Sequence, residues 1–205
     1  MKKLKVLNLY SGIGGNRKLW QNVDVTAVEI DPKIAKMYED NFPNDKMVIG
    51  DAHNFLLKYF KEYDFIWSSP PCPSHSKTNY FIKAMNVYRY PDMKLYEEIL
   101  FLQHFADRLW VVENVQPYYE PLISAQKIGR HLFWSNFRIV ANKQPKDDIG
   151  TMIKGHPNRA NRTPLVERNA TNSELGLHVL QSALGTIPPM PLGTLFDEHK
   201  SEKHV

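Results

Sequence analysis

Residues 4–15 read Leu-Lys-Val-Leu-Asn-Leu-Tyr-Ser-Gly-Ile-Gly-Gly, an apolar run that passes directly into a cluster of glycines. The run from Leu4 to Tyr10 predicts a buried strand. Glycines after a strand let the backbone approach a ligand closely and point the next helix N-terminus at it. We therefore expect a helix over Asn16–Gln21 and a ligand at the glycine turn. Such a unit is typical of the start of an α/β fold.

The same alternation of strand and helix continues along the chain. Further strands are predicted at Asp24–Ile30, Lys46–Gly50, Tyr63–Trp67, Leu109–Val112 and His131–Val140. Helices are predicted from Pro32 to Phe42, over Ala52–Phe60 and after Pro91, where apolar residues recur at helical spacing. This order indicates an α/β fold whose mostly parallel sheet carries helices on both faces.

Five residues that could bind a ligand or react with one follow the predicted strands: Gly12, Glu29, Asp51, Cys72 and Glu113. In a parallel α/β sheet, ligands bind outside the carboxyl ends of the strands. Glu29 lies 17 positions after Gly12, close to the roughly 20-residue offset of a carboxylate that binds a ribose. We therefore expect these residues to share one site. Alternatively, Glu29 and Asp51 could be ordinary acidic residues at helix N-termini.

The candidate nucleophile is Cys72, the single cysteine of the chain, in Ser68-Ser69-Pro70-Pro71-Cys72-Pro73-Ser74-His75-Ser76. The flanking prolines restrict the backbone and would hold the thiol at the rim of the sheet. A lone cysteine is more often a small buried apolar residue, but its place among the strand-end residues favours a reactive thiol here. His75 or Ser76 could orient this thiol or contact a phosphate, or could be ordinary turn residues.

Three motifs, in this order, resemble the cytosine-5 DNA methyltransferase family: Leu7–Gly15, the pair Pro71-Cys72, and Glu113-Asn114-Val115. The resemblance covers residues 4–140 and implies a Rossmann-like fold that depends on S-adenosylmethionine as its cofactor. The cofactor-binding residues that it implies are Tyr10, Gly12, Ile13, Gly14, Gly15, Glu29, Ile30, Asp51, Ala52 and Pro71. Glu29 would hold the ribose hydroxyls and Asp51 the adenine amino group.

The resemblance also implies the chemistry. The Cys72 thiolate would attack ring position 6 of a cytosine, which makes position 5 nucleophilic towards the methyl donor. Glu113 would contact ring nitrogen 3 and stabilise the charge that develops in the ring. Because the thiolate is the reactive form, we expect an electropositive setting around Cys72. Arg130 and His131 are further catalytic candidates as anion-binding residues, or else surface residues at the start of a strand.

Double-stranded DNA is the substrate that the resemblance implies, with the target cytosine flipped out of the helix. The segment Pro73–Tyr90 mixes cations with aromatic residues and could close over DNA, or could be a solvated loop. A net charge of +4 and a pI near 9.0 weakly favour a polyanionic partner. The alternatives are RNA or a free pyrimidine nucleotide as substrate, or an incomplete subunit that needs a partner chain to recognise DNA.

Residues 1–140 are expected to form the catalytic domain, and residues 141–205 a short appendage that could replace a larger DNA-recognition element. Lys143–Arg168 is rich in cations, which suits contacts with phosphates or an exposed loop. Thr171-Asn172-Ser173-Glu174 predicts a capping box for a helix that ends at Gly185 and packs on the sheet. Full-size members of the family carry two further motifs after their recognition domain, one of which contributes to the cofactor pocket, and no counterpart of the final motif is found here.

The composition is typical of an intracellular protein. One cysteine excludes an internal disulfide framework and suits a reducing compartment. The apolar run Val6–Tyr10 is too short and too polar for a signal peptide, and no run approaches the roughly 20 apolar residues of a membrane helix. We therefore expect a cytoplasmic protein with no membrane partner and no bound metal.

Overall fold

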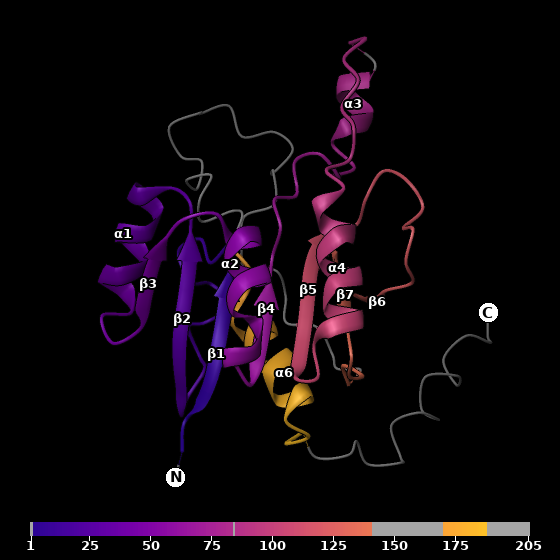
Figure 1. The fold of residues 1–205 in the computed structure, drawn as a ribbon. Coiled ribbons are helices and arrows are strands. Elements are labelled where there is room, and N and C mark those ends of the chain that lie inside the picture. The colour runs from indigo at the N-terminus through magenta and orange to yellow at the C-terminus, as the bar shows by residue number, and fades with distance from the viewer. Residues whose placement is uncertain (1, 84, 141–169, 188–205) are drawn as a thin grey trace, which may run out of the picture.

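The computed structural model describes residues 2–83, 85–140 and 170–187, which contain a seven-stranded sheet of order β3-β2-β1-β4-β5-β7-β6 (Figure 1). The strands are β1 Leu4–Leu9, β2 Val23–Glu29, β3 Lys46–Ile49, β4 Phe65–Ser68, β5 Leu109–Val115, β6 Gln126–Ile128 and β7 His131–Ser135. Strands β1 to β5 run parallel, whereas β7 is antiparallel to both β5 and β6. The predicted α/β fold with a mostly parallel sheet is therefore confirmed.

The order of the strands reverses between β1 and β4. From β1 the chain adds β2 and then β3 on one side, and it returns to place β4 and β5 on the other side. The register pairs Val6 with Phe65 and Leu9 with Ser68, so the carboxyl ends of β1 and β4 lie side by side. Such a reversal opens a crevice at the strand ends where α/β proteins bind ligands.

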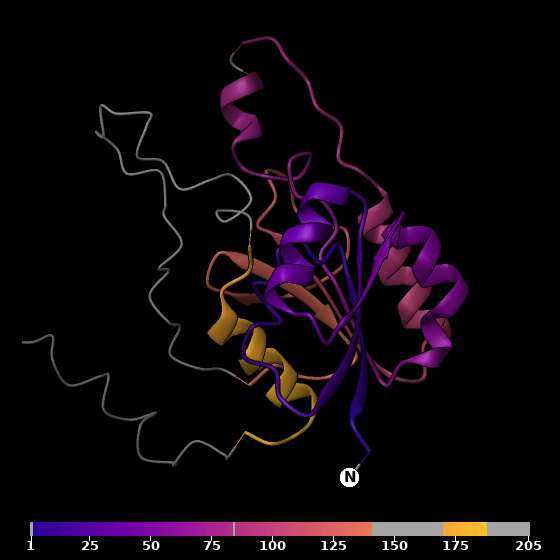
Figure 2. The same ribbon diagram turned by 90° about the vertical axis from the view of Figure 1, so that its left-hand side faces the viewer.

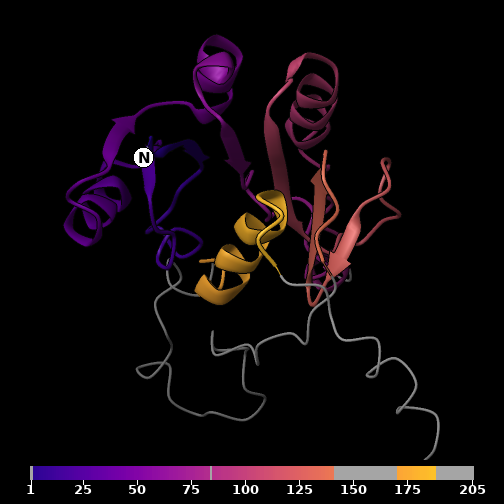
Figure 3. The same cartoon turned by 90° about the horizontal axis from the view of Figure 1, so that it is seen from below.

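Helices cover both faces of the sheet, as predicted. The helices are α1 Pro32–Asn41, α2 Ala52–Tyr59, the 3₁₀ turn η1 Phe60–Glu62, α3 Asn79–Lys83, α4 Lys94–Phe105 and α6 Ser173–Ala183. Figures 2 and 3 show α1 and α6 on one face and α2 and α4 on the other. The short α3 stands away from the sheet, beyond the carboxyl ends of the strands (Figures 1 and 2).

The alternation of side chains along each strand divides the core between the two faces. In β4, Ile66 packs with α2 and α4, whereas Phe65 and Trp67 face α6. The α2 and α4 face also buries Leu7, Leu9, Leu56, Ile99, Leu102, Trp110 and Val112. The α6 face buries Val6, Val25, Val111, Phe133, Leu175, Val179 and Leu180. Because both faces are buried, the central strands are mostly apolar.

The helix predicted over Asn16–Gln21 is wrong. This segment forms consecutive tight turns, in which the N–H groups of Gly14, Arg17 and Trp20 donate to carbonyls three residues earlier. Trp20 is buried on the α6 face, and its indole N–H donates to the carbonyl of Gly176 at 3.0 Å. Trp20 and α6 thus cover the sheet beside β1. This contact with a distant helix outweighs the local sequence pattern that predicted a helix.

The end of the sheet differs from the prediction. The strand expected over His131–Val140 ends at Ser135, and the following residues are irregular. Strand β6 was not predicted, because Gln126–Ile128 is too short to show a hydrophobic period.

The helix predicted after the capping sequence is confirmed with a shifted start. Asn172, not Thr171, caps α6, because its Oδ1 accepts hydrogen bonds from the N–H groups of Glu174 and Leu175. The helix is followed by Gly185, whose φ of +64° is the left-handed conformation that often ends a helix. It packs on the sheet as expected.

The expected domain boundary at residue 140 stays a prediction, since Lys143–Arg168 lies outside the described residues. No helix within residues 2–83, 85–140 and 170–187 is long and apolar enough to cross a membrane.

Candidate active site

The carboxyl ends of β1, β2, β4 and β5 surround one cavity of about 330 Å³. This volume falls in the range of about 300–1,000 Å³ that is typical of small-molecule sites. Of the predicted site residues, Tyr10, Gly12, Ile13, Gly15, Glu29, Ile30, Pro71, Cys72, Glu113 and His131 line it. The topology therefore brings residues that are up to 121 positions apart (His131 and Tyr10, 131 − 10) to a single site.

The glycine turn is held by its own backbone and by Glu29. Gly12 and Gly14 have φ angles of +54° and +81°, which residues with side chains rarely adopt. A Cβ at Gly14 would lie 2.3 Å from the ring of Phe42, so this position also requires glycine for space. Glu29 Oε2 accepts a hydrogen bond from the Gly12 N–H at 3.0 Å. Gly14 thus supports the turn from outside the cavity.

Glu29 is not a helix cap. Its Oε1 accepts hydrogen bonds from the N–H groups of Ile30 and Asp31 at 2.9 and 3.0 Å, and Asp31 is the residue that caps α1. The helix-terminus interpretation holds for Asp51, because it caps α2 and accepts a hydrogen bond from the Asn54 N–H at 2.8 Å. Asp51 nevertheless faces a cavity as well.

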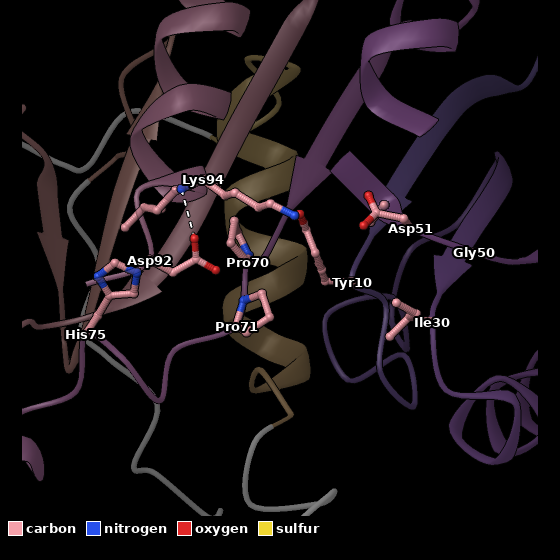
Figure 4. A pocket seen from close by; sticks show the side chains of 11 residues that line it. Tyr10, Ile30, Gly50, Asp51, Pro70, Pro71, His75, Asp92 and Lys94 are labelled. Carbon is pink, nitrogen blue, oxygen red and sulfur yellow. Dashed lines mark hydrogen bonds between the residues drawn. The ribbon is translucent and has the colours of Figure 1, made fainter. Parts of the chain in front are cut away.

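That second cavity, of about 160 Å³, is lined by Asp51, Ala52 and His75 and shares Tyr10, Ile30, Pro70 and Pro71 with the first. Figure 4 shows Asp51 and Ile30 on one side and His75 and Asp92 on the other, with Tyr10 and the two prolines between them. The two cavities therefore form a continuous groove along the prolines that precede Cys72.

Sequence reasoning missed Glu98, which fixes Tyr10 from below the groove. The Tyr10 hydroxyl donates to Glu98 Oε1 at 2.5 Å, and the Ser68 hydroxyl donates to Oε2 at 2.6 Å. His53 Nδ1 lies 3.1 Å from Oε1. Glu98 is fully buried, and burial raises its pKa. The only signal in the sequence is a carboxylate on the apolar face of α4, beside Leu95, Ile99 and Leu102.

Cys72 is half-buried at the mouth of the groove, and the N–H groups of His75 and Ser76 donate to its carbonyl at 3.0 Å. Burial raises the pKa of its thiol, and the Glu113 carboxylate raises it further. The backbone N–H of Cys72 and the charge of Arg130 act in the opposite direction without cancelling this. Among the described residues, burial and the Glu113 carboxylate outweigh the charge of Arg130, so the expected electropositive setting around Cys72 is not found there.

Glu113 is buried at the end of β5, where two hydroxyls and a histidine hold its carboxylate. Oε2 accepts hydrogen bonds from Ser69 at 3.1 Å and from Thr171 at 2.8 Å. Oε1 lies 3.5 Å from Nε2 of His131, which is itself buried rather than on the surface. His131 thus sits beside a carboxylate, while the Nε of Arg130 is buried without a partner among the described residues.

Asn114 joins the two strands that carry the catalytic candidates. Its Nδ2 donates to the carbonyl of Pro70 at 2.9 Å, and its Oδ1 accepts from the N–H of Val115. It therefore connects the end of β5 to the prolines before Cys72.

Ala170 and Thr171 line the larger cavity, although the sequence suggested only a helix cap at this point. A Cβ at Gly15 would lie 2.5 Å from the carbonyl oxygen of Thr171, so the glycine turn and the start of α6 are in close contact. A segment that follows the last strand of the sheet by 35 residues (Ala170 after Ser135, 170 − 135) thus completes the wall of the site. No local pattern shows this, because the contact depends on where α6 packs.

Within the described parts of the chain, no group of three or more His, Cys, Asp or Glu side chains could hold a metal ion.

The family model of the C-5 cytosine-specific DNA methylase matches residues 4–116. Human tRNA (cytosine(38)-C(5))-methyltransferase is 24% identical over 155 residues, which are 63% of this chain and 40% of the human protein. The protein of the same name from Spodoptera frugiperda is 29% identical over 85 residues, which are 38% of this chain and 26% of that protein. The chain thus spans less than half the length of these curated relatives.

Similar solved structures include a DNMT2 mutant from Spodoptera frugiperda, which is 25% identical with a TM-score of 0.41 and aligns over 55% of this chain and 36% of that one. A putative DNA modification methyltransferase encoded within an Escherichia coli prophage is 24% identical with a TM-score of 0.39, over 58% of this chain and 34% of that one.

Proposed function

Since this chain belongs to the C-5 cytosine-specific DNA methylase family, we propose that it transfers a methyl group from S-adenosylmethionine to carbon 5 of a cytosine in DNA. The observation that carries the proposal is the single cavity at the strand ends. It holds the Cys72 thiol and the Glu113 carboxylate together with the glycine turn and Glu29. A nucleophile, an acid and a cofactor-type turn are the parts that this reaction needs in one place.

S-adenosylmethionine supplies, when it is bound, a methyl group on a positively charged sulfur. The residues of the groove fit this cofactor. Each carboxylate oxygen can accept about two hydrogen bonds, so Oε2 of Glu29, which accepts only the Gly12 N–H, keeps acceptor capacity for a ribose hydroxyl. Asp51 would accept a hydrogen bond from the adenine amino group at the other end of the groove. Tyr10 and Pro71 would contact the cofactor between them.

Cys72 acts first on the base. Its thiolate forms a bond to ring carbon 6 of the cytosine, and the electron pair of the 5,6 double bond moves towards carbon 5 and ring nitrogen 3. Carbon 5 would then take the methyl group, while the bond between that methyl group and the sulfur breaks and the sulfur, which keeps the electron pair, leaves as a neutral thioether. Loss of the proton at carbon 5 restores the double bond and expels the thiolate of Cys72, so the enzyme is regenerated.

Glu113 stabilises the charge that develops in the ring by hydrogen bonding at nitrogen 3. Its two oxygens are not equivalent, because Oε2 already accepts hydrogen bonds from the Ser69 and Thr171 hydroxyls. Oε1, which faces His131, is therefore the oxygen that would carry a proton to ring nitrogen 3. His131 would position this oxygen and would not contact the base itself.

The thiol needs help to ionise, because burial and Glu113 hold its pKa above the ordinary range. Among the described residues, the charge of Arg130 favours the thiolate. A proton on Glu113 would remove the opposing negative charge. The same protonation therefore serves both the base and the nucleophile.

The substrate is proposed to be duplex DNA with its target base flipped out. RNA is a second candidate, because the named relatives act on a tRNA. An incomplete subunit that needs a partner chain for recognition is a further candidate, since the chain spans only 40% of the human relative.

Purified protein given labelled S-adenosylmethionine tests the proposal on three substrates, namely duplex DNA, tRNA and free cytidine nucleotide. We expect 5-methylcytosine in a nucleic acid, measured by mass spectrometry after nuclease digestion. Cys72→Ser should abolish the product while cofactor binding, measured by calorimetry, is retained. Cofactor binding with no product on any nucleic acid would favour the subunit that requires a partner.

A further inference from the structure

A hollow on the segment after Cys72 takes no part in the site above. It has a volume of about 440 Å³. Five of the nine residues that line it are tyrosines, namely Tyr80, Tyr88, Tyr90, Tyr118 and Tyr119. The lining includes two cations, Lys83 and Arg89, and no carboxylate. Helix α3, which contributes Tyr80 and Lys83, projects beyond the carboxyl ends of the strands (Figures 1 and 2).

The aromatic side chains around this hollow are unusually exposed. Tyr88 is 73% and Tyr90 89% exposed, and Phe81 on α3 is 72% exposed. Large contiguous aromatic surface is rare on soluble proteins and marks a site of interaction. The exposed rings therefore indicate a surface that binds a partner.

Specific contacts build the hollow. The Tyr80 hydroxyl donates to the carbonyl of Tyr118 at 2.7 Å, and the two rings meet edge to face with centroids 6.1 Å apart. The Tyr118 hydroxyl donates to the carbonyl of Arg89 at 3.0 Å. These bonds connect α3, the chain at Arg89 and the chain that follows β5. Specific contacts between three segments therefore hold the hollow in shape.

The charge of the hollow indicates an anionic partner with flat rings. Neither Lys83 nor Arg89 forms an ion pair with a carboxylate in residues 2–83, 85–140 and 170–187. Aromatic side chains interleaved with free cations are the chemistry by which proteins hold unpaired nucleotides, since bases stack on the rings and phosphates meet the cations. A protein partner would need acidic groups to match the same cations.

The hollow adjoins the nucleophile. Asn79 and Arg89 both donate hydrogen bonds to the carbonyl of Pro73, the residue that follows Cys72. Tyr119, at the base of the hollow, has its hydroxyl 2.6 Å from Nδ1 of His75. A nucleotide in the hollow would thus lie beside the turn that carries the thiol.

We propose that this hollow binds an unpaired base next to the target cytosine, stacked on the tyrosine rings, while Lys83 and Arg89 contact the flanking phosphates. The inference rests on the proposed function and deepens it. It departs from the duplex substrate proposed above on one point, because it assigns to this chain a DNA or RNA in which the neighbour of the cytosine is itself unpaired. A base inside a duplex cannot enter, because its two faces are covered by the adjacent bases.

The test compares wild-type protein with the double variant Tyr88→Ala, Tyr90→Ala, because both side chains are largely exposed and neither hydrogen-bonds to another side chain in residues 2–83, 85–140 and 170–187. The probes are a fluorescein-labelled single-stranded DNA with one cytosine, the RNA of the same sequence, and the DNA annealed to its complement. We expect affinity for the single strands to fall about 5- to 100-fold and affinity for the duplex to stay unchanged. Tyr88→Phe, Tyr90→Phe should keep wild-type affinity.

Phe105→Ala is the matched control, because Phe105 is a similarly exposed ring on α4, 58% exposed. Unchanged binding of the single strands by the tyrosine double variant would overturn the inference, as would an equal loss for single strands and duplex. A change of oligomeric state with unchanged nucleic-acid binding would also overturn it, in favour of a protein partner.

Methyl transfer is measured on the same probes, so that the two proposals can fail separately. Loss of single-strand binding in a protein that methylates no probe would uphold the hollow and contradict the proposed methyl transfer. Methylation that the tyrosine variant performs as well as wild type on every probe would uphold the transfer and contradict the role of the hollow.

Discussion

The two sides of the cavity are built in different ways. On the β1 side, the backbone fixes the glycine turn, and Glu29 accepts hydrogen bonds from three N–H groups. On the β4 side, Cys72 lies between two prolines, and the pKa of its thiol is raised. The chain then continues into the exposed segment around α3. We infer that the backbone and Glu29 hold the cofactor side in place, whereas the nucleophile side presents a thiol whose pKa is raised by burial and by Glu113.

The largest expected effect separates the chemistry from cofactor binding. Glu113→Gln should lower kcat for methyl transfer about 10²- to 10³-fold, because an amide cannot supply the proton at ring nitrogen 3. Single-turnover kinetics would measure this loss, and calorimetry should find cofactor affinity unchanged. Ser69→Ala, which removes one donor to Glu113, should lower kcat less. A parallel loss of cofactor affinity would show that the two sides are not separate.

The reciprocal variant acts on the cofactor side. Glu29→Gln should weaken cofactor affinity by roughly 10- to 100-fold, because hydrogen bonds to a charged group contribute about 1.5–3 kcal/mol. The rate at which iodoacetamide alkylates Cys72 should not change. Asp31→Asn is the control, since Asp31 also accepts a backbone N–H but only caps α1. A changed alkylation rate in Glu29→Gln would contradict the separation.

The dependence of the glycine turn on α6 can be tested through Gly176. A Cβ at this position would lie 2.2 Å from the backbone oxygen of Asn16, so the helix must shift. Gly176→Ala should lower the free energy of unfolding by about 1–3 kcal/mol, measured with urea, and should also weaken cofactor binding. Gly50→Ala, where a Cβ meets nothing within 4 Å, is the control for stability only, because Gly50 lines the smaller cavity. Unchanged stability would show that α6 does not pack against the turn.

The smallest expected effect concerns the ionisation of Cys72. Alkylation requires the thiolate, so its rate should rise with pH and reach half-maximum above the ordinary thiol value of about 8.5. Glu113→Gln removes a negative charge and should move this midpoint down, whereas Arg130→Gln removes a positive charge and should move it up. Cys72 is the only thiol, so the signal is unambiguous. A midpoint below the ordinary value would contradict a protonated resting thiol.

The strand-end residues could be predicted because each depends on a local pattern. Gly12, Glu29, Cys72 and Glu113 each follow an apolar run, and parallel strands place their carboxyl ends on one edge. The family motifs lie at those ends for the same reason, so the α/β fold and most of the cavity lining were available from the chain alone. The turn at Asn16–Gln21 shows the limit of this reasoning, because a contact of Trp20 with α6 replaced the expected helix.

Contacts between distant segments were decided only by the tertiary structure. Glu98 on α4 contacts Tyr10, 88 positions away, and Thr171, just before α6, contacts Glu113, 58 positions away; no periodicity connects such positions. The state of the Cys72 thiol belongs to the same class. A sequence names the group that can react, but its pKa is set by the burial and the charges that folding brings around it.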